Sequence, residues 1–149
     1  MPDTLLVRVQ GTQDPEEGGR AEPIWDAEFN ALLIGLKRKI KTVSAAYTVV
    51  GEDSGTLICV DTAATVTLPA ASADLIGVFV DIAVIADVSV TIDGTAGELI
   101  TFNDIAANSV AFSTTSEKVG ASVRATCISA TKWLIQPMTE ETQTMTVTT

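Results

Sequence analysis

Short apolar runs, separated by Gly, Asp, Asn and Ser, follow one another along the chain from residue 44 to residue 137. Such runs, rich in Val, Ile and Thr, are typical of β-strands, because branched side chains pack well on a pleated surface. The pattern predicts strands at residues 46–50, 56–60, 64–68, 77–86, 88–93, 97–102, 109–113, 120–130 and 132–137. So many short strands predict a mainly β fold, an antiparallel β-sandwich or barrel-like domain over residues 44–137.

Two of these runs also indicate how the strands are buried. Residues 88–93 (VSVTID) alternate strictly, so one face of that strand should be buried and the other wet. Residues 77–86 alternate less and should be buried on both faces. Pro69 should end its strand, because proline cannot donate a hydrogen bond to a neighbouring strand. Turns are expected at Asp53-Ser54-Gly55, Asp93-Gly94 and Thr131-Lys132.

A helical pattern occupies residues 23–43, before the predicted strands. Its apolar side chains recur at spacings of four, three, four and four positions and form one stripe, made of Trp25, Phe29, Leu32, Leu36 and Ile40. Pro23 suits the first helical position, and the acidic early turns and basic last turn complement the helix dipole. We expect an amphipathic helix over residues 23–41. Its stripe could cover the sheet of its own chain or pack against copies of itself.

The two ends of the chain have different patterns. Residues 1–22 are interpreted as an extended attachment arm, or else as a disordered tail, with a strand-like run made of Thr4, Leu5, Leu6, Val7, Arg8 and Val9. Because this run cannot bury its apolar side alone, an arm must pair with another surface. The Thr-rich C-terminal tail, residues 138–149, alternates in a strand pattern and should either pair with a neighbour or fray.

Charge is distributed unevenly along the chain, whose net charge is −10. Residues 1–43 carry seven acidic and six basic side chains, whereas residues 44–149 carry twelve acidic and three basic ones. Nucleic-acid binding is not expected, because displacing counterions from phosphates requires a basic surface. No apolar run approaches the roughly 18 residues of a membrane span. The N-terminus also lacks the features of a signal peptide, so we expect folding in a cytosol.

Catalytic chemistry is sparse in this sequence. There is no histidine, hence no Ser-His-Asp triad, Cys-His pair or His metal ligand, and no glycine-rich phosphate motif. Cys59 and Cys127 lie in apolar runs without a CxxC spacing, which predicts two buried free thiols, with a disulfide as the alternative. The carboxylate pairs Glu52-Asp53 and Glu140-Glu141 lie in turn or tail sequence, where a raised pKa is not expected. We therefore expect no enzyme, no cofactor and no metal site.

A series of motifs across residues 44–137 resembles a β-module found in bacteriophage virion proteins. In chain order these motifs are Tyr47-Thr48-Val49, Asp53-Ser54-Gly55, Leu57-Ile58-Cys59-Val60-Asp61, Thr65-Val66-Thr67-Leu68-Pro69, Gly77-Val78-Phe79-Val80, Val90-Thr91-Ile92-Asp93-Gly94 and Thr131-Lys132-Trp133-Leu134-Ile135. The segment WDAEFNALLIGLKRKI also resembles the helix that precedes trimeric regions in phage fibres. The resemblance implies a trimeric part of the virion surface and brings no catalytic residues with it.

These observations lead to one expected function and two alternatives. The expected function is a capsid decoration (cement) protein or short head spike, made in the host bacterial cytoplasm and bound to the outer surface of the head. Its expected partners are the major capsid protein and two further copies of itself. The alternatives are a trimeric tail-fibre or baseplate component, which would contact tail proteins, and a receptor- or carbohydrate-binding β-module. The small size of the chain favours the head, since full tail fibres are far longer.

Overall fold

The computed structural model describes residues 32, 35 and 37–149, and the chain divides into two units, Met1–Lys37 and Arg38–Thr149. The predicted arm residues Thr4 to Val9, and three residues of the predicted stripe, Trp25, Phe29 and Leu36, lie outside the described residues. The fold below is that of Arg38–Thr149, the β domain.

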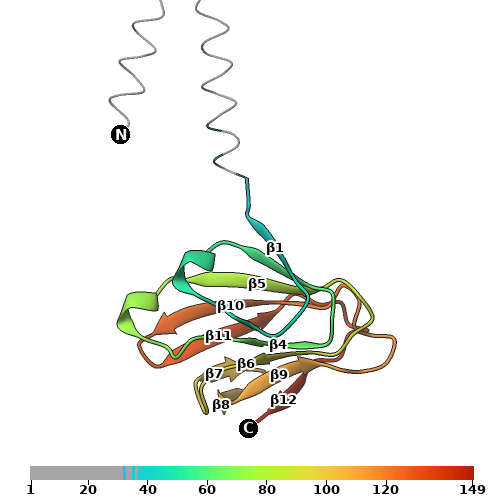
Figure 1. The fold of residues 1–149 in the computed structure, drawn as a ribbon. Helices are drawn as coiled ribbons and strands as arrows, with labels where there is room; N and C mark the ends of the chain where they lie inside the picture. The colour runs from blue at the N-terminus through green and yellow to red at the C-terminus, as the bar shows by residue number, and fades with distance from the viewer. Residues whose placement is uncertain (1–31, 33–34, 36) are drawn as a thin grey trace, which may run out of the picture. The chain divides into compact units, whose positions relative to one another are not determined.

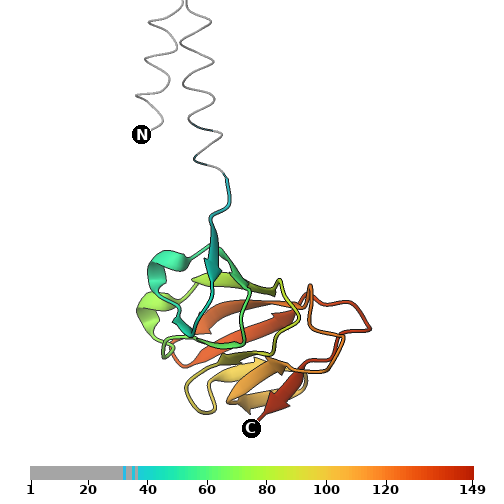
Figure 2. The same cartoon turned by 45° about the vertical axis from the view of Figure 1, so that its right-hand side comes forward.

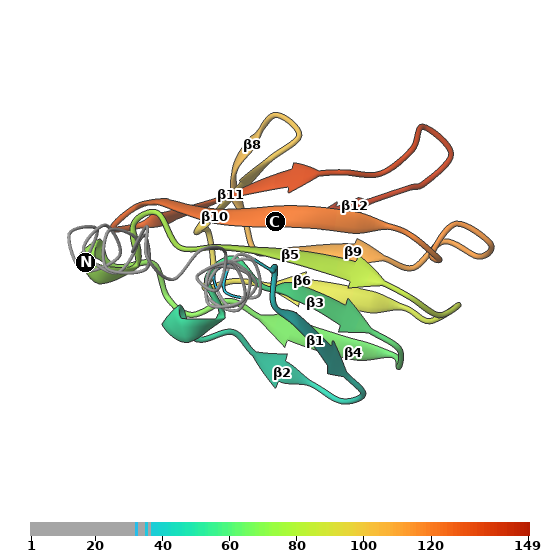
Figure 3. The same cartoon turned by 90° about the horizontal axis from the view of Figure 1, so that it is seen from above.

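The β domain consists of two sheets (Figures 1, 2 and 3). The seven-stranded sheet has the order β1-β3-β5-β10-β11-β7-β8. Its strands are β1 (Ile40–Val43), β3 (Leu57–Val60), β5 (Phe79–Val84), β10 (Ser122–Ser129), β11 (Lys132–Pro137), β7 (Leu99–Thr101) and β8 (Asp104–Ala107). The five-stranded sheet has the order β12-β9-β6-β4-β2. Its strands are β12 (Thr146–Thr148), β9 (Ser109–Phe112), β6 (Val90–Asp93), β4 (Ala64–Thr67) and β2 (Tyr47–Thr48). Each of the nine predicted runs contains a strand, and the mainly β fold is confirmed.

The expectation of mainly antiparallel pairing is wrong. Strands β1 to β6 belong alternately to the seven-stranded and the five-stranded sheet. Each strand from β3 to β6 pairs in parallel with the strand two places before it in the chain. The C-terminal half then adds mostly antiparallel pairs, among them the hairpin β10–β11. Five of the ten strand pairs within Arg38–Thr149 are therefore parallel. Alternation along one strand determines which side chains are buried, but it contains no information about the direction of the neighbouring strand.

The two sheets enclose one apolar core. From the seven-stranded sheet the core receives Ile58, Val60, Val80, Ile82 and Trp133, all fully buried. From the five-stranded sheet it receives Val66, Ile92, Val110 and Phe112, likewise buried. Trp133 also satisfies its ring nitrogen, since its Nε1 donates to the Pro69 carbonyl at 3.0 Å. The strand end predicted at Pro69 thus supplies the hydrogen-bond partner of the largest core side chain.

The predicted helix is wrong at its C-terminal end, because these residues form strand β1. Residues 40–43 pair in parallel with β3, so the helix predicted over residues 23–41 cannot extend to residue 41. Ile40 consequently belongs to an edge strand and is not part of a helical stripe; its side chain is 69% exposed. Leu32, the one stripe residue described outside the β domain, is also exposed. Strand β12 pairs with β9, which makes the end of the predicted tail part of the five-stranded sheet.

The two turn glycines that the sequence singled out serve different purposes. Gly55 has a φ of +79°, in the left-handed region that favours glycine, and it follows the short 3-10 helix η1 (Gly51–Asp53). Gly94 is required by packing instead. A Cβ at this position would lie 2.5 Å from Cδ2 of Leu99, so any side chain would displace a buried leucine.

The outward surfaces of the two sheets differ in chemistry. On the seven-stranded sheet, outward positions of neighbouring strands form three rows. The first contains Ile40, Leu57, Asp81, Arg124 and Gln136, the second Phe79, Thr126, Leu134 and Ile100, and the third Thr42, Cys59, Ala83 and Ser122. We call this surface the seven-stranded face. On the five-stranded sheet the corresponding rows are Thr48, Thr67, Asp93, Ser109 and Thr148, then Thr65, Thr91, Ala111 and Thr146. We call this surface the threonine face.

Both cysteines are buried free thiols, so a polar thiol reagent should label them slowly. Cys127 is 1% exposed and Cys59 is 9% exposed, so a reagent reaches either sulfur only when the surrounding structure opens. We expect labelling of the native protein at least about tenfold slower than labelling of a cysteine placed at the exposed Thr115. Equal rates for the native and the introduced cysteines, measured by mass spectrometry over time, would contradict this burial.

Candidate functional site

Two carboxylates, Asp53 and Asp81, are the buried charged side chains among the described residues, with 5% and 1% exposure. A buried charge is costly unless hydrogen bonds and opposite charges compensate for it. Both carboxylates lie near β1, where the chain joins the β domain. The cationic partners of these two carboxylates therefore show which segments of the chain are held together in this region.

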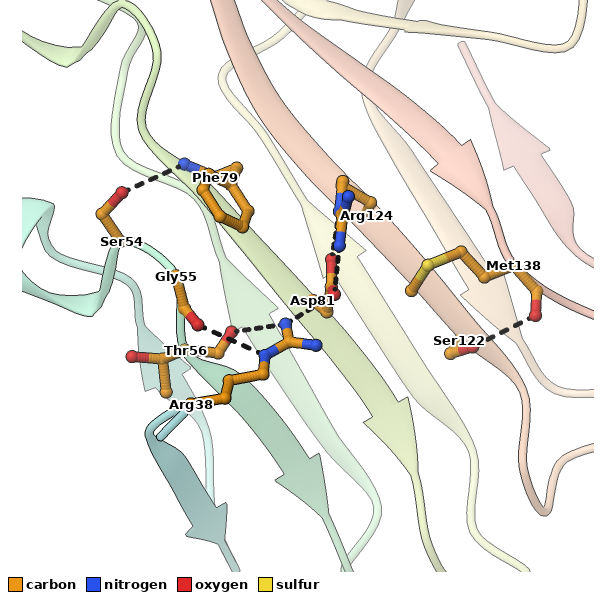
Figure 4. A network of polar contacts seen from close by, with 9 residues as sticks. All are labelled: Arg38, Ser54, Gly55, Thr56, Phe79, Asp81, Ser122, Arg124 and Met138. Carbon is orange, nitrogen blue, oxygen red and sulfur yellow. Dashed lines mark hydrogen bonds and ion pairs between the residues drawn. The ribbon is translucent and has the colours of Figure 1, made fainter. Parts of the chain in front are cut away.

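Asp81 lies at the centre of the seven-stranded face, between two arginines (Figure 4). On the neighbouring strand, directly opposite Asp81, Arg124 donates from Nε to Oδ1 at 2.7 Å and from Nη2 to Oδ2 at 2.8 Å. Arg38, two residues before β1, donates from Nη2 to Oδ2 at 2.5 Å. Arg124 makes the bidentate contact with a carboxylate that guanidinium geometry favours. The carboxylate is thus shared by a strand of the domain and by the chain that leads into it.

Arg38 makes further contacts that fix its position (Figure 4). Its Nε donates to the Gly55 carbonyl at 3.2 Å, and its Nη2 donates to the Thr56 carbonyl at 3.3 Å. The Arg124 guanidinium in turn lies 5.2 Å from the ring centre of Phe79. This is within the range of a cation–π interaction. Both arginines are therefore held by several groups at once, although each side chain is about 40% exposed.

The pKa of Asp81 is lowered from its usual value. Burial raises this pKa, but the hydrogen bonds from Arg124 and Arg38 lower it by more, and so do the charges of the two arginines. The carboxylate therefore stays ionised, and the cluster formed by Arg38, Asp81 and Arg124 holds one net positive charge. Such a cluster is suited to holding structure together, because its members are already paired.

Asp53 forms a second network on the inner side of β1. It accepts hydrogen bonds from Lys41 Nζ at 2.9 Å, from the Tyr47 hydroxyl at 2.6 Å and from the Val50 amide at 3.1 Å. Lys41 Nζ also donates to the Tyr47 hydroxyl. Burial raises the pKa of Asp53, and these hydrogen bonds lower it by more, so the net shift is downward. The pKa of Lys41 is raised, mainly by its hydrogen bond to Asp53.

The two networks hold the same short strand from opposite sides. Arg38 lies immediately before β1 on the seven-stranded face, whereas Lys41 points from β1 toward η1 and β2. Between them they connect the β1 segment to β2, to η1, to the residues just before β3 and, through Asp81, to β5 and β10. Since β1 is an edge strand of four residues, its own hydrogen bonds with β3 would hold it only weakly. The clamp, as we call Arg38, Asp81, Arg124, Lys41 and Asp53 together, fixes the point where the N-terminal residues leave the domain.

In the carboxylate pair Glu52-Asp53, Asp53 lacks the raised pKa of a general acid. Both residues line a surface depression of about 400 Å³, together with Lys39, Ile40, Lys41 and Thr56. A general acid at neutral pH needs a raised pKa. Asp53 has a lowered pKa instead, and Lys41 and Tyr47 occupy its oxygens. The described residues contain no group of three or more Cys, Asp or Glu side chains able to hold a metal ion.

The sequence did not identify the clamp. The basic last turn of the predicted helix is expected to complement the helix dipole, yet Arg38 and Lys41 both reach buried carboxylates. The available indication was Asp81, a lone acid inside an apolar run expected to be buried on both faces. A carboxylate in that position requires a cationic partner. Which cation it meets depends on contacts 43 residues apart in the chain, which spacing alone does not reveal.

Replacing Asp81 with asparagine should destabilise the β domain at neutral pH, by about 1–3 kcal/mol, because charge-assisted hydrogen bonds are lost. The folded-state pKa of Asp81 is lowered, so the pair stabilises the fold above about pH 4, the value of an unfolded Asp, and this stability is lost as the pH falls through the folded-state pKa. The difference between wild type and Asp81→Asn should therefore shrink at acid pH. Urea unfolding at a series of pH values measures it, with the exposed Asp74→Asn as a matched control. A difference that stays constant with pH would contradict the pairing.

Comparison with known proteins leaves the chain without an assigned family: no protein-family model matches it, and no curated protein is significantly similar to it. Among the described residues, no helix is long and apolar enough to cross a membrane.

Proposed function

We propose that this protein is a structural protein of a bacteriophage virion, a capsid decoration protein or short head spike bound to the outer surface of the head. The observation that carries the proposal is the clamp around β1. A protein that is held by one end and exposed to solvent at the other transmits load through the junction between the two parts. In this chain β1, the first strand of the β domain after the N-terminal residues, is held in the domain by two charge networks with buried carboxylates.

In this proposal the N-terminal residues are the attachment element. The strand-like run Thr4 to Val9 would add to a free sheet edge on the major capsid protein, where main-chain hydrogen bonds supply affinity. The clamp would keep β1, the first strand after the attachment element, joined to the rest of the β domain. No cofactor and no catalytic step are part of the proposed function.

The composition of the β domain suits an outer surface. Within Arg38–Thr149 there are twelve acidic and six basic side chains, and a net negative charge favours solubility and opposes nonspecific association. The threonine face is uniformly polar apart from Ala111 and presents small hydroxyl groups to water. These features support a domain that faces solvent on a crowded particle.

We further propose that the protein acts as a homotrimer. Three arms on one assembly would bind with higher avidity than a single arm, without requiring any single contact to be tight. The apolar stripe of the predicted helix would supply one contact between copies, and its described member Leu32 is half exposed in the single chain. Light scattering of the purified protein at micromolar concentration should give a mass three times 15.6 kDa. A monomeric mass under these conditions would contradict this part of the proposal.

Binding to isolated virus parts tests the location. Purified protein should co-sediment with shells that lack it and should not co-sediment with tails. The reverse result would favour the tail-fibre or baseplate alternative and overturn the head assignment. Tyr47 and Phe79 are half-buried and Trp133 and Phe112 are buried, which leaves Phe102 as the exposed aromatic side chain among the described residues. A stacking platform for sugars is thus weakly developed in this part of the chain.

A further inference from the structure

The seven-stranded face is apolar at positions where an exposed sheet surface is usually polar. Leu57, Phe79, Leu134 and Ile100 point outward from four different strands and remain partly exposed. At the free edge of the same face, Ile40 is 69% exposed. Within Arg38–Thr149 the helical segments are two 3-10 turns, η1 and η2 (Ala73–Leu75), and neither supplies a layer over this sheet. Several apolar side chains left partly exposed on one sheet face mark a surface that a partner can cover.

The threonine face of the same domain provides an internal comparison. Its rows contain six threonines and one serine and no large apolar side chain. Both faces belong to one sandwich and share one core, so sheet formation alone does not explain why their outward residues differ. Hydroxyl groups remain well solvated, whereas outward leucine and phenylalanine side chains gain from being covered. The threonine face is therefore suited to water and the seven-stranded face to a protein partner.

The charges on the seven-stranded face indicate which partner. The face has three cationic groups, Arg38, Arg124 and Lys132, and one carboxylate, Asp81, which both arginines neutralise in part. The Lys132 amine donates to the carbonyls of Gly97 and Ile105, at 2.6 Å each, and has no acidic partner within Arg38–Thr149. The other side chains of Arg38–Thr149 include eleven acidic and three basic ones. The face is thus complementary in charge to the remainder of its own domain.

We propose that the seven-stranded face packs against the acidic surface of a second copy of this chain. The contact is heterologous, because packing this face against itself would oppose like charges. A heterologous contact that closes on itself generates a ring, and three copies are the smallest closed ring of this kind. Arginine and aromatic side chains at the centre of such a contact are also the residues that contribute most to interfaces. This inference rests on the proposed homotrimer and adds the surface through which its β domains meet.

Photochemical cross-linking of the full-length purified protein tests this surface. Gln136 is exposed, lies beside Arg124 on the seven-stranded face and can be replaced with p-benzoyl-phenylalanine. Thr91, on the central strand β6 of the threonine face, is the matched control position. Irradiation should join two or three chains covalently from position 136 and should leave position 91 monomeric on a denaturing gel. Adding Leu134→Glu to the first variant should reduce the cross-link at least about tenfold, because a carboxylate would be buried in the contact.

Three results would overturn the inference: no cross-link between chains from position 136, equal cross-linking from position 91, or a cross-link from position 136 to residues 1–37 of the same chain. Circular dichroism and thermal melting should first show that each variant retains the fold. The assay uses free protein, so its result is separate from binding to shells. A protein that binds shells normally but gives no cross-link refutes this surface and leaves the proposed function in place.

Discussion

Replacing Trp133 with alanine should lower the free energy of unfolding by about 3–5 kcal/mol, because it empties the centre of the core. The Trp133 side chain is fully buried and lies on β11, which pairs with β10 on one side and β7 on the other. Its removal leaves a cavity and also leaves the Pro69 carbonyl without the hydrogen bond from Nε1. A loss of this size is a large fraction of the stability of a small domain.

The conservative variant separates these two contributions. Trp133→Phe keeps most of the apolar volume but cannot donate to the Pro69 carbonyl, so it should cost less than Trp133→Ala. Thr91→Ala, on the threonine face, is the surface control and should change the free energy of unfolding by less than about 1 kcal/mol. Urea unfolding, followed by far-UV circular dichroism because tryptophan fluorescence changes with the substitution, gives the free energy of unfolding of all three variants. A loss below about 1 kcal/mol for Trp133→Ala would show that this ring is not central to the core.

Deleting residues 1–22 should abolish binding to shells while leaving the β domain folded. A strand of about six residues can make up to about six main-chain hydrogen bonds, each worth roughly 1 kcal/mol net. Three arms acting together multiply the effect through avidity. We therefore expect the affinity for shells to fall by at least about 100-fold, measured by co-sedimentation with particles that lack the protein.

A single substitution within the arm provides a stricter test of the same prediction. Val7→Pro removes one main-chain donor and is incompatible with the centre of a ladder, whereas Val7→Thr keeps the donor and the branched side chain. Binding should weaken for the proline variant and remain close to normal for the threonine variant. Unchanged occupancy of the deletion variant, with the fold intact, would show that the β domain itself contacts the shell.

The strands could be predicted from the sequence because strand formation here depends on local patterns of apolar and polar side chains. The runs that became β6, β10 and β11 each place buried and more exposed side chains in alternation, and this pattern requires no knowledge of the neighbouring strand. Strand β8, with the sequence DIAA, lacks branched or aromatic residues apart from Ile105 and was not predicted. Its position depends on pairing with β7, which local propensity does not determine.

The first strand was missed because its residues fit the end of a predicted helix better than a strand. Ile40 fits the last position of the helical stripe, and the sequence of Ile40–Val43, IKTV, does not alternate between apolar and polar side chains. Contacts distant in sequence decide between helix and strand, since Arg38 and Lys41 meet Asp81 and Asp53 only when this segment is extended beside β3. The same contacts form the clamp, which is why the clamp and β1 were overlooked together. Ion pairs between distant residues have no periodic pattern in the sequence.

Electron cryomicroscopy of intact particles tests the central claim most directly. The account predicts density for the β domain outside the shell of the head, in groups of three, with the end that bears β1 nearest the shell and the threonine face toward solvent. Particles assembled with the protein lacking residues 1–22 should have bare shells at the same positions. Density for the β domain at the tail, or on the head with the β1 end pointing away from the shell, would contradict the account.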